Sequence, residues 1–73
     1  MDISKALSIV LRHNRNKVGY SQEELAYRSN LDRTYISLLE RGKRNPTLNV
    51  LFSISAALDI SASELIRQIE DLT

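Results

Sequence analysis

Residues 21–41 read SQEELAYRSNLDRTYISLLER, a stretch that contains two helix starts separated by one tight turn. Ser21 followed by Glu24 is typical of a capping box, in which the serine hydroxyl accepts a backbone N–H and the glutamate side chain reaches back. Asp32 is a second good N-cap. Because so few residues join the two helices, Asn30 is expected to take the left-handed backbone conformation. We therefore predict two short helices that cross at a steep angle.

Residues that favour helix starts and helix ends recur along the whole chain. Ser61 and Glu64 repeat the capping-box pattern, and Gly19 and Gly42 mark helix ends. No stretch alternates apolar and polar residues over the length of a strand. We therefore predict an all-α fold, a compact single domain over residues 1–73 with five helices at about residues 2–17, 21–29, 32–41, 47–58 and 61–72.

Size and composition exclude several classes of protein. The chain has 73 residues, 42% of them apolar, and no cysteine, so we expect neither disulfides nor thiolate metal sites. No apolar run approaches the ~20 residues of a membrane span, and we expect a cytoplasmic protein that does not contact a membrane. His13 is the only histidine, and no nucleophile–base set or glycine-rich phosphate loop is present. We therefore expect no metal, no cofactor and no enzymatic activity.

Charge is unevenly placed along the chain although the net charge is only +1. Residues 12–44 contain eight basic and four acidic side chains, whereas residues 59–73 contain one arginine and four acids. A basic middle and an acidic tail suggest two faces with different partners. The basic part suits a nucleic acid. The acidic tail, on the side away from DNA, could be where RNA polymerase or another protein docks.

At this point the residues resemble a known family. The chain looks like the helix–turn–helix of the phage Cro and repressor (XRE-type) family over nearly its whole length, through Gln22, Ala26, the turn at Asn30, Ile36 and the run Leu39-Glu40-Arg41-Gly42. Residues 33–37 and 40–42 look most like the controller proteins of restriction–modification systems. The resemblance implies a lambda-repressor-like fold and a DNA-binding transcription regulator. The main departure is Asn30, where the family usually has glycine, and we expect it to cost a little stability without changing the fold.

The start of the third helix is the expected base-reading edge, because a recognition helix enters the major groove with its N-terminal end first. Arg33 can bind a guanine through O6 and N7, and Thr34 can offer a methyl group to thymine or a hydroxyl to either kind of pair. Tyr35 could reach a phosphate or stack against a sugar, and Ser37 is the next exposed position. The alternative is that all four are ordinary solvent-facing residues.

Phosphate contacts are expected on either side of this edge. The resemblance implies one at Gln22, made together with the positive end of its helix. The loop that follows the third helix holds three cations and no acid, so it can follow the DNA backbone and supply affinity without sequence information, unless it is simply a solvated loop. The candidate phosphate-binding residues are Gln22, Arg41, Lys43, Arg44, Asn45 and Asn49.

The resemblance also implies an ion pair between Arg15, late in the first helix, and Glu40, at the end of the third. Such a pair would tie the first helix to the recognition helix. Breaking a buried pair from one side is costly, so we predict that Glu40 serves the fold and does not contact DNA.

One recognition helix buries too little surface to be selective, and two-fold dimers read two half-sites about one DNA turn, ~34 Å, apart. Apolar side chains beyond the needs of one core occur in the last two helices, unless all of them fill the core of the monomer: Phe52, Leu58, Ile60, Ile66, Ile69 and Leu72. We therefore expect a homodimer on an inverted-repeat operator in double-stranded DNA, controlling a restriction–modification operon. The alternatives are a phage-type repressor or antitoxin and, from a different class, a helical protein-interaction module without DNA binding.

Overall fold

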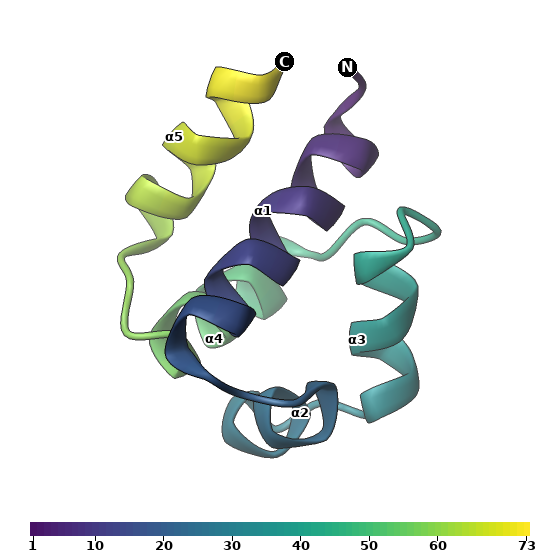
Figure 1. Ribbon diagram of the computed structural model, residues 1–73, viewed down its shortest axis with the longest axis vertical. Coiled ribbons are helices and arrows are strands. Elements are labelled where there is room, and N and C mark those ends of the chain that lie inside the picture. Colours follow the sequence, from purple (N-terminus) through teal and green to yellow (C-terminus); the bar gives the residue numbers. More distant parts are fainter.

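The computed structural model describes all 73 residues and contains five α-helices and no strand, which confirms the predicted all-α class. The helices are α1 (Ile3–Val18), α2 (Gln22–Ser29), α3 (Arg33–Glu40), α4 (Leu48–Ala57) and α5 (Ala62–Leu72) (Figure 1). Each helix begins one residue after the predicted start, because the predicted ranges included the N-cap residues. Those five N-caps are Asp2, Ser21, Asp32, Thr47 and Ser61.

The capping boxes are only half formed. The hydroxyls of Ser21 and Ser61 accept the backbone N–H groups of Glu24 and Glu64 at 3.0 and 3.1 Å. The predicted return bonds from the glutamate side chains are absent, and that part of the prediction is wrong. The Glu24 carboxylate instead accepts from Arg28 at 2.6 Å, and the Glu64 carboxylate accepts from an arginine one turn further on. A charge-assisted hydrogen bond to a guanidinium is stronger than one to a neutral amide.

Left-handed residues end four of the helices. Asn30 has φ 58° and ψ 43°, which confirms the conformation predicted for the turn between α2 and α3. The Leu31 N–H then donates to the Ala26 carbonyl at 2.8 Å, closing the Schellman motif that ends α2. Gly19 and Gly42 end α1 and α3 in the same way, and Asp59 (φ 57°), which the sequence pattern did not single out, ends α4.

The helices enclose one core around α1. α1 packs against α3 and α5, which lie on opposite sides of it, while α2 packs against α3 and α4, and α4 against α5 (Figure 1). Thirteen buried apolar side chains form the core: Ala6, Leu7, Val10, Leu11, Leu25, Ala26, Ile36, Leu39, Leu51, Ile54, Leu58, Leu65 and Ile69. α1 therefore lies between α3 and α5 and connects these two sides of the molecule.

A buried polar contact fixes α5 against α1. The Nδ2 atom of Asn14 donates to the Val10 carbonyl and to Oε1 of Gln68, both at 2.8 Å. Leaving such a buried amide without partners would cost about 1–3 kcal/mol, so the position of α5 along α1 is specified by this pair.

None of the helices is by itself long and apolar enough to cross a membrane. α4 and α5 reach the necessary length and composition only as a pair, and they are bent by 106° where they meet.

Candidate nucleic-acid interface

The first turn of α3 is open to solvent while its opposite face is fixed in the core. Asp32 caps the helix by accepting the Thr34 N–H at 3.0 Å. Arg33 and Thr34 are exposed, whereas Ile36 and Leu39 are completely buried. The helix is therefore anchored along one face and can present the side chains of its first turn to a groove of DNA.

Of the other two expected base-reading residues, Tyr35 and Ser37 are both partly buried. The Tyr35 ring packs against the core, and the guanidinium carbon of Arg44 lies 6.0 Å from its centroid. This is the outer limit of a cation–π contact. This contact links α3 to the loop that follows it.

The loop after α3 exposes its cations and is anchored to α1. Arg41, Lys43 and Arg44 are all exposed, and none of them forms an ion pair within the protein. Asn45 is held at the other end of the loop, because its Oδ1 accepts the Ser4 hydroxyl at 2.7 Å. This contact occupies the amide oxygen of Asn45 and leaves its N–H donors for an acceptor such as a phosphate.

The α4 residue in this set, Asn49, is exposed in the first turn of its helix. That turn follows the basic loop directly, with Thr47 as its N-cap. Asn49 therefore follows the loop cations closely in the chain and is exposed, as they are.

Glu40 and Arg15 meet in the interior, as the resemblance implied. Arg15 donates from Nε to Oε2 of Glu40 at 2.6 Å and from Nη2 to Oε1 at 2.9 Å, and it also donates to the Tyr20 carbonyl. The side chain of Glu40 is 1% exposed and that of Arg15 is 13% exposed. The hydrogen bond to Glu40 raises the pKa of Arg15 above its ordinary value, so this fork stays charged on the arginine side.

Two further side chains converge on Glu40. Gln22, the first residue of α2, donates from Nε2 to Oε1 at 3.1 Å. Arg12 donates from Nη2 to the backbone carbonyl of Glu40 at 2.8 Å, and its Nε lies 3.8 Å from Oε1. The sequence analysis gave Arg12 no role, although its position three residues before Arg15 places both arginines on one face of α1.

The expected interface residues of α4 and α5 divide into two groups. Phe52, Ile66 and Leu72 are exposed and Ile60 is partly buried, so these four are available to a partner. Leu58 and Ile69 are only 4% and 8% exposed and belong to the monomer core, which corrects their assignment to an interface. Leu58, at the end of α4, could not be placed from the apolar pattern, because that pattern does not separate inner from outer faces on a helix that is apolar nearly all round. Ile69 lies one turn after the fully buried Leu65, on the face of α5 that packs inward.

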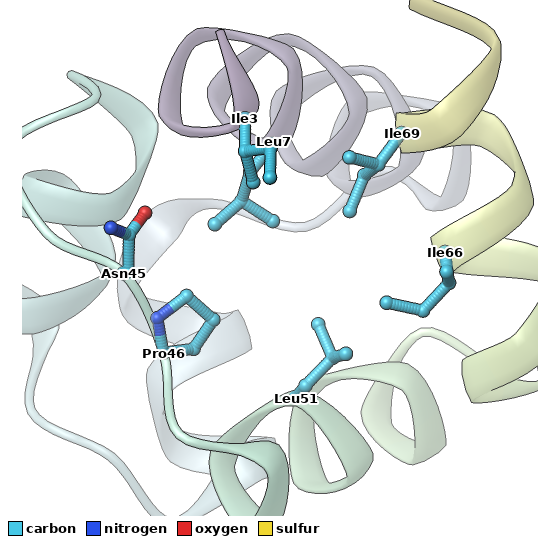
Figure 2. Close-up of a pocket in the computed structure, with 7 residues that line it drawn as sticks. All are labelled: Ile3, Leu7, Asn45, Pro46, Leu51, Ile66 and Ile69. Atoms are coloured by element: carbon cyan, nitrogen blue, oxygen red, sulfur yellow. The ribbon is translucent and has the colours of Figure 1, made fainter. Parts of the chain in front are cut away.

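An apolar groove adjoins these exposed residues. Figure 2 shows its lining, which comes from α1, α5, α4 and the end of the basic loop: Ile3, Leu7, Ile66, Ile69, Leu51, Asn45 and Pro46. Ile3 and, on α4, Leu48 are further exposed apolar side chains that the sequence analysis did not select. The apolar surface therefore extends from α5 towards the start of α1.

Comparison with known proteins settles the class. A family model described as helix-turn-helix matches residues 11–65. The chain belongs to the XRE-type helix–turn–helix family. As a member of that family it is a transcriptional regulator, close to restriction–modification controller proteins, and the predicted resemblance is confirmed.

Two relatives and one solved structure illustrate how similar these regulators are. Control protein C.SmaI of Serratia marcescens is 44% identical over 66 residues, which cover 90% of this chain and 79% of that protein. Control protein C.MunI of Mycoplasma sp is 50% identical over 56 residues, covering 77% and 76%. The crystal structure of the restriction–modification controller protein C.AhdI from Aeromonas hydrophila matches with a TM-score of 0.83 and 42% identity, over 85% of this chain and 94% of that one.

Proposed function

We propose that this helix–turn–helix regulator binds an inverted-repeat operator as a homodimer and controls a restriction–modification operon. The observation that carries the proposal is the exposed first turn of α3, with Arg33 and Thr34 free and Ile36 and Leu39 fixed in the core. The similarity to the restriction–modification controller protein C.AhdI, together with that to control proteins C.SmaI and C.MunI, supports the kind of operon.

In this proposal the bases are read by Arg33, Thr34, Tyr35 and Ser37. The phosphates are held by Gln22, Arg41, Lys43, Arg44, Asn45 and Asn49. The protein acts in the cytoplasm, without enzymatic activity, by occupying promoter DNA and so blocking or recruiting RNA polymerase. Since phosphate contacts release counterions, its affinity for DNA should fall steeply as the salt concentration rises.

Dimerisation is proposed through the accessible apolar residues of α4, α5 and their connection. Phe52, Ile66 and Leu72 are exposed, and Ile60 is partly buried. α5 lies on the opposite side of α1 from α3 (Figure 1). Pairing through α5 would therefore leave both recognition helices free, and two-fold symmetry would direct them to half-sites about one DNA turn apart. Control of regulation would come through protein concentration and dimer formation.

The experiment that tests the DNA proposal is selection from a pool of random duplexes, followed by gel shifts of the selected sequences over a series of salt concentrations. We expect enrichment of an inverted repeat whose half-site centres are about one turn apart, bound with steep salt dependence. The absence of any salt-sensitive enrichment would refute DNA binding. Enrichment of a site without two-fold symmetry would refute the homodimeric arrangement.

The dimer itself is tested by sedimentation equilibrium. Ile66→Asp places a charge on the exposed apolar surface and should shift the protein to monomer. Ser63→Asp adds the same charge at an exposed position of α5 and should leave the dimer intact. Equal association of the two variants would show that the interface lies elsewhere.

A further inference from the structure

We infer that Arg12 and Gln22 form a phosphate-binding pair that Glu40 holds in place at the C-terminal end of the recognition helix. This inference rests on the proposed DNA binding and assigns a function to an arginine that the set of expected contacts did not include. Its target is a phosphodiester of the DNA backbone at the edge of the half-site.

The first step is that one carboxylate oxygen brings the two side chains together. Oε1 of Glu40 accepts from Nε2 of Gln22 at 3.1 Å and lies 3.8 Å from Nε of Arg12. Arg12 is further fixed by the hydrogen bond from its Nη2 to the Glu40 backbone carbonyl at 2.8 Å. Because Glu40 is itself buried and held by the Arg15 fork, the pair is ordered before any DNA binds.

The second step concerns charge. Two guanidinium groups, those of Arg12 and Arg15, share the single carboxylate of Glu40, and neither pairs with another acid. One positive charge is therefore left uncompensated. Arg15 is nearly buried whereas Arg12 is 56% exposed, so the excess charge faces solvent through Arg12.

The third step concerns the free donors. A guanidinium carries five N–H groups and a side-chain amide carries two. The contacts of Arg12 and Gln22 to Glu40 leave N–H groups unused on both side chains. One charged and one neutral group of donors can both bind the acceptor oxygens of a phosphodiester. Such contacts do not depend on the base sequence.

The last step is the position along α3. Arg33 begins this helix and Glu40 ends it seven residues later, so the two are about 10.5 Å apart at 1.5 Å per residue. The major groove is about 12 Å wide. When the Arg33 end reads bases, the Glu40 end therefore reaches the rim of the groove, where the phosphates are.

The inference is tested with Arg12→Ala and a matched control, Arg67→Ala. Arg67 on α5 is 58% exposed, and its replacement removes the same charge as the replacement of Arg12. Binding to the selected operator and to a random duplex is measured by fluorescence anisotropy over a salt series. Arg12→Ala should lower the slope of log affinity against log salt by about 1, and should weaken both duplexes alike. Arg67→Ala should leave the slope unchanged.

Further variants separate DNA contact from a purely structural role. If Arg12 only caps α3, its replacement lowers the melting temperature and leaves the slope as in the wild type, and that outcome overturns the inference. Arg12→Lys keeps the charge and should keep the slope. Should the alanine variant fail to fold, Arg12→Gln keeps an amide donor for the Glu40 carbonyl while losing the charge, and should show the reduced slope. Salt-sensitive binding by the wild type with an unchanged slope in the variants refutes this inference alone, whereas no binding by the wild type refutes the proposed function as well.

Discussion

Replacing Glu40 by alanine should unfold the protein more than it alters any contact with DNA. The side chain is 1% exposed and accepts from Arg15 at 2.6 and 2.9 Å and from Gln22 at 3.1 Å. Truncation leaves the Arg15 guanidinium, itself only 13% exposed, without its counter-charge. It also leaves a space where the carboxylate packed between α1 and α3.

The expected loss follows from these contacts. Removing one partner of a buried ion pair costs about 3–5 kcal/mol, because the remaining charge stays buried and unpaired. At about 0.05–0.15 kcal/mol per residue, a domain of this length has a total stability of roughly 4–11 kcal/mol. The substitution therefore removes a large part of the stability. For a domain of this size, each 1 kcal/mol corresponds to roughly 4–8 °C, so the melting temperature should fall by about 12 °C or more.

Thermal and urea unfolding followed by circular dichroism measure this loss. Glu24→Ala is the matched control, because it removes a carboxylate that accepts from an arginine at the same 2.6 Å but on the surface, and it should shift the midpoint far less. Combining Arg15→Met with Glu40→Leu removes both charges and should restore much of the stability. If Glu40→Ala instead melts like the wild type and fails only to bind DNA, Glu40 serves DNA binding and not stability, and the reasoning is refuted.

Three further outcomes are expected. Arg33→Ala should cost about 1–3 kcal/mol of binding free energy on the selected operator and reduce discrimination between bases, whereas Lys43→Ala should weaken binding to all duplexes alike. Competition gel shifts compare the two variants. If Arg33→Ala loses as much affinity on random DNA as on the operator, Arg33 does not read bases. Asn30→Gly should leave the melting temperature unchanged or raise it, since glycine adopts the left-handed conformation without strain, and a clear drop would show that the asparagine side chain is needed. Hydrogen bonds from Arg67 and then Gln68 lower the pKa of Glu64 from 4.5 to about 2, so its contribution to stability is present above pH 4.5 and is lost as the pH falls towards 2. NMR titration of the Glu64 carboxylate reads that pKa directly, and an ordinary value would contradict the ion pair.

Capping and turn residues in the sequence were sufficient to predict the number and approximate limits of the helices. Ser21, Asp32 and Ser61 marked helix starts because their short polar side chains satisfy N–H groups that the first turn cannot pair. Asn30 was recognisable because few other residues accept a left-handed backbone. These signals are properties of single residues and their near neighbours, so the sequence alone carries them.

Contacts between distant segments were less accessible. Leu58 could not be assigned to the core from periodicity, because α4 is apolar on several sides and its inner face depends on how it packs against α2 and α5. Ile69 shares a stripe with Leu65, and the packing of α5 against α1 and α4 decides that this stripe is buried within the monomer. Arg12 was missed because its partner, the carbonyl of Glu40, is a backbone group 28 residues away. Glu24 and Glu64 were expected to accept the backbone N–H groups of their N-cap residues, but each forms an ion pair with a nearby arginine instead. The capping-box pattern does not take such competing partners into account.

The buried contact between Asn14 and Gln68 has a consequence for operator geometry. Residues of α3 would read the half-site, and residues of α5 would contact the second subunit. α1 lies between these two helices and connects them. The angle at which α5 packs on α1 would then set the length of the spacer between the two half-sites. Asn14→Leu, a change at a buried position of α1, should therefore change which spacer lengths are tolerated before it changes which bases are preferred.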